Sequence, residues 1–128
     1  WDYVGIGTAQ EYDYTDITDY VDDADALLLS VPQNARTSAY TLQASDKGKH
    51  ISITTGGVTV PPSIFSAGDV VSIYNNSSSN QTITAGAGVT LRLVGTATTG
   101  NRTLAQRGLA TILCVSANEF VITGGGIS

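Results

Sequence analysis

The sequence is poor in the side chains on which most enzyme chemistry depends. Its 128 residues include one cysteine, Cys114, one histidine, His50, and no methionine. A single cysteine excludes an internal disulfide and a zinc site built from cysteines. Cys114 lies in the apolar run 109–115, where we expect a buried, unreactive thiol because free cysteine packs like a small hydrophobe.

Long apolar runs and an excess of basic residues are also missing. The apolar runs, such as residues 26–29, are far shorter than the ~20 residues that cross a bilayer, so we predict no membrane insertion. The net charge of −5 argues against nucleic acid as a partner, because phosphates require a basic face. Without methionine or a leader, we expect a fragment, a processed product or part of something longer.

Acidic residues are concentrated at the start of the chain. Eight of the eleven lie in residues 1–25, which contain no basic residue. The same segment is rich in aromatic side chains, which are enriched at interfaces. We therefore predict that residues 1–37 form an extended acidic attachment arm, in which residues 22–30 could form a short helix. The aromatic residues expected to make its contacts are Trp1, Tyr3, Tyr12, Tyr14 and Tyr20.

Residues 38–128 alternate between short β-type runs and clusters of turn residues. Strand starts recur at roughly 8–12-residue spacing, which predicts an all-β fold, a small antiparallel β-sandwich or barrel. Gly56 and Gly57 favour a hairpin turn. Residues 109–122 are predicted to form a terminal hairpin. The expected strands are 39–43, 49–54, 58–60, 70–74, 81–84, 89–93, 109–115 and 120–123. Period-two alternation predicts that the mainly buried residues are Ile51, Ile53, Val71, Ile73, Leu91, Leu93, Ile112 and Val121.

No set of residues in the sequence forms a recognisable catalytic or metal site. The aspartates at 13–25 do not follow the alternate-position pattern of a calcium loop. His50 stands alone, on the strand face opposite the isoleucines, where a surface role is expected. Asp46, Asp69 and Glu119 lie in turn regions, where acidic residues are common for backbone reasons. We therefore predict no catalytic residue, no metal, no cofactor and no enzyme activity.

One loop is a candidate for binding. Asn75, Asn76 and Asn80 enclose a run of serines and are predicted to form an exposed loop tip between two strands. Their amides could bond to a sugar on a host surface, although the loop contains no aromatic platform.

The chain from residue 40 onward resembles a β module of bacteriophage virion proteins, often found near the C-terminus of tail-fibre-like structural proteins. The likeness is carried by residues 40–42, 46–49, 57–61, 65–69, 73–76, 81–84, 109–114 and 118–122. The resemblance implies a non-enzymatic structural protein on the surface of the virion: a tail fibre, spike or capsid-decoration subunit. Its implied partners are other virion proteins and copies of itself, most simply in a homotrimer.

Two alternatives remain open. The first is a glycan- or receptor-binding β module that uses a loop end of the fold. The second is a subunit of a non-viral extracellular filament, joined by addition of its N-terminal segment as a strand to a neighbour.

Overall fold

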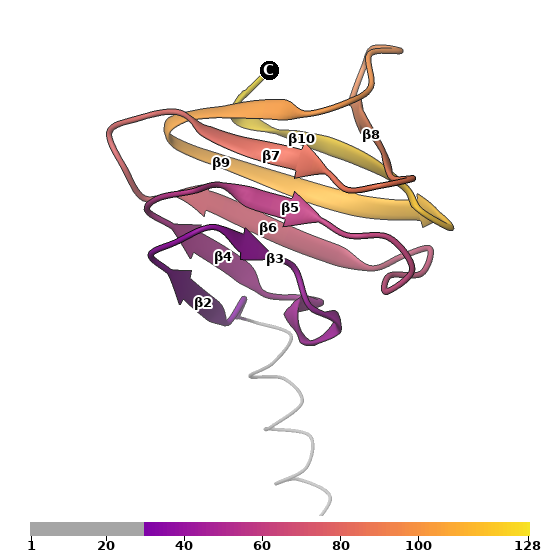
Figure 1. Ribbon diagram of the computed structural model, residues 1–128, viewed down its shortest axis with the longest axis horizontal. Coiled ribbons are helices and arrows are strands. Elements are labelled where there is room, and N and C mark those ends of the chain that lie inside the picture. Colours follow the sequence, from indigo (N-terminus) through magenta and orange to yellow (C-terminus); the bar gives the residue numbers. More distant parts are fainter. Residues whose placement is uncertain (1–29) are drawn as a thin grey trace, which may run out of the picture. The chain divides into compact units, whose positions relative to one another are not determined.

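The computed structural model describes residues 30–128 (Figure 1). The predicted attachment residues Trp1, Tyr3, Tyr12, Tyr14 and Tyr20, and residues 22–29 of the predicted helix, lie outside the described residues. One compact unit spans Pro32–Ser128. In the described part of the chain, no helix is long and apolar enough to cross a membrane.

This unit is all-β, as predicted, with a nearly closed, barrel-shaped sheet. Each of the eight predicted strands has a counterpart. The strand that was not predicted, β2, falls inside the segment assigned to the arm. Its sequence, QNAR, has no β-branched residue, so it owes its conformation to pairing with its neighbour. The elements are β2 (Gln33–Arg36), β3 (Tyr40–Thr41), the 3₁₀ helix η1 (Ala44–Asp46), β4 (His50–Ile53), β5 (Val58–Val60), β6 (Val70–Asn75), β7 (Gln81–Ala85), β8 (Thr90–Leu93), β9 (Arg102–Ser116) and β10 (Glu119–Ile127).

The strands form two parallel stacks that face each other. One stack is β2, β4 and β6, and the other is β3, β5 and β7; in Figure 1 the second stack lies in front of the first. Successive strands from β2 to β7 belong alternately to the two stacks, so the chain winds around the space between them. Strand β8 also pairs in parallel, with β10.

The pairing is therefore mixed, and not antiparallel throughout as predicted. The antiparallel ladders are those that β9 makes with β6, β7 and β10. Gly56 and Gly57 do adopt positive φ values, 90° and 72°, but they turn the chain from one stack to the other. A turn of this kind has the same composition as a hairpin turn. The sequence therefore could not show whether neighbouring strands run parallel or antiparallel.

The terminal hairpin, β9–β10, joins the two stacks. Along one edge of β9, residues 109–113 pair with β6 and residues 102–104 pair with β7. Its other edge pairs with β10. The hairpin was predicted correctly over residues 109–122, but β9 begins earlier and also serves the second stack.

The core fills the space between the stacks. Six of the eight predicted core residues are buried, while Leu93 and Val121 are partly buried. Cys114 is buried as expected, and burial raises the pKa of its thiol. Phe65 and Phe120 meet edge to face with ring centroids 5.9 Å apart. The buried apolar residues are Leu42, Ile51, Ile53, Val58, Val60, Phe65, Val71, Ile73, Ile83, Leu91, Leu104, Ala110, Ile112, Cys114, Phe120 and Ile122.

The hairpin bends where β9 passes from one stack to the other. Arg107 has a φ of 57° and Gly124, on β10, a φ of 152°. A Cβ at Gly124 would lie 2.1 Å from the Leu109 carbonyl oxygen, and one at Gly108 would lie 2.9 Å from the Gly125 carbonyl oxygen. The two strands can therefore approach this closely only because both positions are glycine.

We expect Gly124→Ala to lower the free energy of unfolding by at least about 2 kcal/mol, because the added methyl group meets backbone that cannot move aside and the φ is unfavourable. Gly125→Ala is the matched control, since a Cβ there meets nothing within 4 Å. Urea unfolding of both variants and the parent measures the difference. Equal stability of the two variants would show that the bend tolerates a side chain.

Candidate functional site

The carboxylate of Asp46, at the end of η1, is a buried charged group held by several hydrogen bonds. It is fully buried, with 0% exposure. It accepts hydrogen bonds from Tyr40 Oη at 2.6 Å, Gln43 N at 2.7 Å and Asn34 Nδ2 at 2.8 Å. Its oxygens are thus satisfied by three donors, as a buried carboxylate requires.

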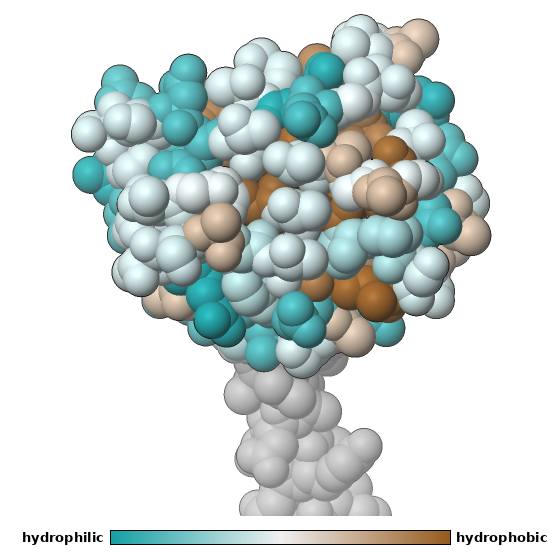
Figure 2. Space-filling model, in the orientation of Figure 1, coloured by the Kyte–Doolittle hydropathy of each residue, from teal (hydrophilic) through white to brown (hydrophobic). Residues whose placement is uncertain are grey.

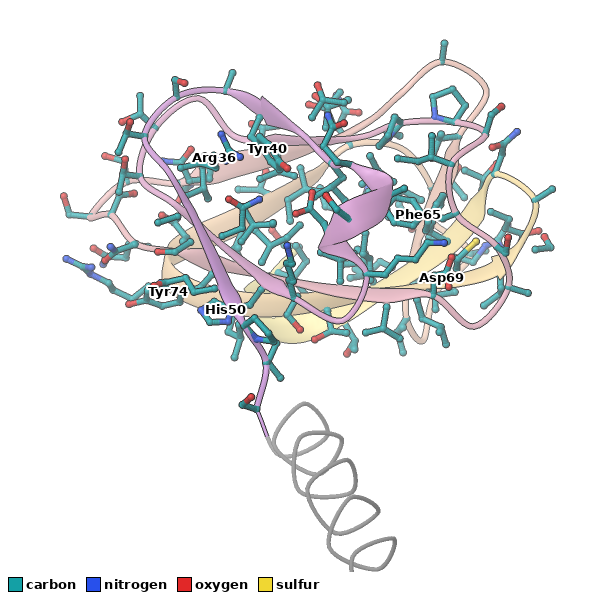
Figure 3. All side chains as sticks on the ribbon, turned by 90° about the horizontal axis from the view of Figure 1, so that it is seen from below. Arg36, Tyr40, His50, Phe65, Asp69 and Tyr74 are labelled. Atoms are coloured by element: carbon teal, nitrogen blue, oxygen red, sulfur yellow. The ribbon has the colours of Figure 1, made fainter. Side chains whose placement is uncertain are left out.

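These contacts bridge β2 and β3, the two ends of the sheet path. Asn34 comes from β2 and Tyr40 from β3, and Asn34 Nδ2 also donates to Tyr40 Oη at 3.0 Å. The Arg36 guanidinium carbon lies 4.4 Å from the centre of the Tyr40 ring, and Figure 3 shows these two side chains together. We call Asn34, Tyr40, Gln43 and Asp46 the Asp46 network. It links the ends of the barrel with side chains.

The network keeps Asp46 ionised at neutral pH. Burial acts to raise the pKa of this carboxyl, but the hydrogen bonds from Tyr40, Gln43 and Asn34, with the charge of Lys49, outweigh it and lower the pKa below 3.8. The pKa of Tyr40 is raised by burial and by its bond to Asp46. Neither group is set to exchange a proton near pH 7, so the arrangement fits a structural role.

Within residues 30–128, the two remaining acidic residues, Asp69 and Glu119, also hold local structure. Asp69 accepts from Ser66 N at 2.8 Å and lies 3.4 Å from Lys47 Nζ. Its pKa is lowered chiefly by the bond from Ser66.

Glu119 accepts from Arg92 Nη1 at 2.8 Å and from Ser116 Oγ at 3.0 Å. Its pKa is lowered chiefly by the bond from Arg92. Among residues 30–128, no three His, Cys, Asp or Glu side chains come together to hold a metal ion.

The predicted binding loop is only partly exposed. Asn76 and Asn80 are exposed, but the prediction was wrong for Asn75, which is 0% exposed. Asn75 Nδ2 donates to the carbonyl oxygens of Ser79 at 2.7 Å and of Leu104 and Ala105 at 3.0 Å each. Asn75 therefore fixes the loop to β9. At the tip, Arg107 Nη1 donates to Asn76 Oδ1 at 2.6 Å.

Gln81 extends this polar packing to the neighbouring turn. Its Oε1 accepts from Gly57 N at 2.9 Å, while its Nε2 donates to Thr54 O at 3.0 Å and to Ser77 Oγ at 3.2 Å. Sequence reasoning missed this residue, because a glutamine at the start of a strand is usually solvated. The loop end of the barrel is held by these side-chain bonds to backbone.

A second feature missed by sequence reasoning is an apolar outer face on the sheet of β6, β9 and β10. In the run 109–115 the inward positions are Ala110, Ile112 and Cys114, which are buried. The outward positions are also mostly apolar: Leu109 is 52% exposed and Val115 42%. The available signal was this run, in which only Thr111 is polar, since a strand with one solvated face usually alternates apolar and polar residues.

The other stack presents a different outer surface. Thr41, Thr59 and Thr84 align across β3, β5 and β7, and Thr82 aligns with Thr103 on β9. Figure 2, which views the molecule from this side, shows hydrophilic and near-neutral side chains with only small hydrophobic areas. The two outer faces of the barrel thus differ in chemistry.

No protein-family model, no curated protein and no solved structure matches this chain.

We expect Asp46→Asn to lower the free energy of unfolding by about 2–3 kcal/mol at pH 7, because the amide nitrogen that replaces one carboxylate oxygen cannot accept a hydrogen bond and would face at least one of the three donors. Asp69→Asn is the control: its amide oxygen can still accept from Ser66, so its loss should stay below about 1 kcal/mol. Urea unfolding at pH 7 compares them. Equal losses of unfolding free energy in the two variants would show that Asp46 contributes no more to the fold than Asp69.

The same pair gives an expected pH dependence. Because the pKa of Asp46 is lowered on folding, its contribution is complete above the unfolded pKa and is lost as pH falls through the folded value. The stability gap between the parent and Asp46→Asn should therefore narrow below the unfolded pKa, about 3.9. A gap that stays constant down to acid unfolding would contradict the assignment.

Proposed function

We propose that this chain is a non-enzymatic structural protein of a bacteriophage virion, a tail-fibre, spike or capsid-decoration subunit displayed on the particle surface. It is anchored by its N-terminal arm and associates with copies of itself, as a homotrimer, and with other virion proteins. The observation that carries the structural role is the use of Asp46, Asp69 and Glu119 in fixing the fold. The virion location is supported by the sequence resemblance.

The architecture suits a load-bearing part. Two stacks share one hairpin, and the Asp46 network joins their far ends, so the barrel has few independent segments. The loop end is likewise held by Asn75 and Gln81. An exposed apolar face on such a body suits assembly, since contiguous apolar surface commonly marks a contact site.

A test of the location uses antibodies raised against the full chain. Immunogold electron microscopy and mass spectrometry of purified phage particles from the source culture should find the chain on the particle, in a fixed number of copies. Antibodies against a host cytosolic protein provide the control. Particles that are free of the chain, while it is abundant in the same lysate, would refute the virion location.

Glycan or receptor binding is a second candidate, favoured by Arg107. This residue has a φ of 57°, and strained non-glycine residues cluster at functional sites. Its guanidinium donates to Asn76 Oδ1 at 2.6 Å, and Asn80 in the same loop is also exposed, so this loop offers several groups that can bond to a sugar. The filament alternative concerns an N-terminal segment outside the described residues.

If this loop end binds sugar, the full chain should retain a glycan on an array of bacterial surface polysaccharides, and Arg107→Gly should weaken retention at least about tenfold through loss of a charged hydrogen-bond donor. Glycine preserves the positive φ, so the variant should fold. Arg102→Gly, on the same strand, is the comparison. Absence of retained glycans, or equal weakening by both variants, would argue against this candidate.

A further inference from the structure

We infer that the outer face of β6, β9 and β10 is the surface on which copies of this chain pack against one another. The inference supplies the contact surface for the self-association in the proposed function and rests on that part alone. The face, called the β6–β9–β10 face, consists of Val70, Ser72, Tyr74, Leu109, Thr111, Leu113, Val115, Val121 and Thr123.

Strand register places these side chains in continuous rows. Val70, Leu113 and Val121 align in one row, and Leu113 is followed on the same side by Val115. Tyr74 aligns with Leu109. The apolar groups therefore span the three strands instead of being scattered singly.

A row of hydroxyl groups lies between the apolar rows. It is formed by Ser72, Thr111 and Thr123, and the hydroxyl oxygens of Ser72 and Thr111 are 2.9 Å apart. Because Ser72 and Thr111 bond to each other across two strands, these two hydroxyls can be covered at a smaller desolvation cost than isolated hydroxyls. The row does not interrupt the face as a contact surface.

Exposure of the large apolar groups is high for a well-packed body. Leu109 is 52% exposed, Val115 42%, and Val70 and Leu113 37% each. Four such residues on one sheet are what an interaction surface requires, since each could add burial worth about 25 cal/mol per Å². The core residues of the same strands are at most 2% exposed, so the exposure is not a sign of loose packing.

Charge favours another copy of the chain as the occupant. None of the nine residues on the face is charged, so two copies brought together meet no like-charge repulsion here. At the border, Arg92 and Glu119 already pair with each other at 2.8 Å. A strongly charged partner would find no unpaired opposite charge, and a single aromatic residue, Tyr74, is a poor platform for sugar.

The area of the face suits a weak contact between copies. Its three strands, at a spacing of about 4.8 Å, and seven residues of β9, at about 3.4 Å each, give a face of about 14 Å by 24 Å. Two such faces in contact remove about 700 Å² from water, which is the size of a weak, concentration-dependent interface.

The test compares the full chain with Leu113→Lys and Leu109→Lys by sedimentation velocity and light scattering over a concentration series. The parent should form dimers or trimers, and each lysine variant should weaken association at least about thirtyfold, as expected for loss of a central contact residue. Thr82→Lys is the matched control, because Thr82 is an exposed strand residue on the other stack, and it should associate like the parent.

Circular dichroism and thermal unfolding establish that each variant is folded, and Val115→Lys replaces either leucine variant that is not. A parent chain that is monomeric at every concentration overturns the inference and the self-association in the proposed function, but not the virion location. An oligomer that withstands both lysine substitutions on the face overturns only the placement of the interface.

Discussion

The bend in hairpin β9–β10 is the constraint on which the barrel depends. Strand β9 must pair with β6 over residues 109–113 and with β7 over residues 102–104, on the same edge. The two stacks face each other, so β9 can reach both only by turning between them, at Arg107 and Gly108, next to the point where Gly124 packs closely on Leu109 and Ala110. The Asp46 network acts at the far side, where β2 and β3 have no ladder with each other. On one side the barrel is held together by the backbone pairing of β9 with both stacks. On the other side it is held by the hydrogen bonds to the buried carboxylate of Asp46.

Much of the fold could be predicted from local sequence, because period-two alternation reports which face of a strand is buried. That reasoning located eight strands and most of the core, including Ile51, Ile53 and Ile73. It could not give strand direction, since Gly56 and Gly57 suit a hairpin and a crossover equally. It also missed β2, whose QNAR sequence takes its conformation from β4.

The candidate sites were harder to predict because they depend on contacts distant in sequence. Asn75 looked like the start of a solvated asparagine–serine loop, yet its amide reaches Leu104 and Ala105 on β9. The acidic residue at position 46 suited a turn, but nothing local indicated that Asn34 and Tyr40 would converge on it. The exposure of Leu109 and Leu113 could not be predicted from the sequence, because both lie in an apolar run whose alternate residues are buried in the core.

These features give the body two unlike outer surfaces, one threonine-rich and one apolar, and the proposed contact between copies uses the apolar one. The most direct test of contact through the β6–β9–β10 face is the distance between copies, measured by electron spin resonance with a label at Thr111→Cys. Cys114 is buried, so the introduced thiol is the one that reacts. Labels at Thr111 should lie close together, within the about 10 Å spacing of packed sheets plus the length of the label linkers, while labels at Thr82→Cys should be much farther apart. Short distances at Thr82 with none at Thr111 would contradict contact through the β6–β9–β10 face.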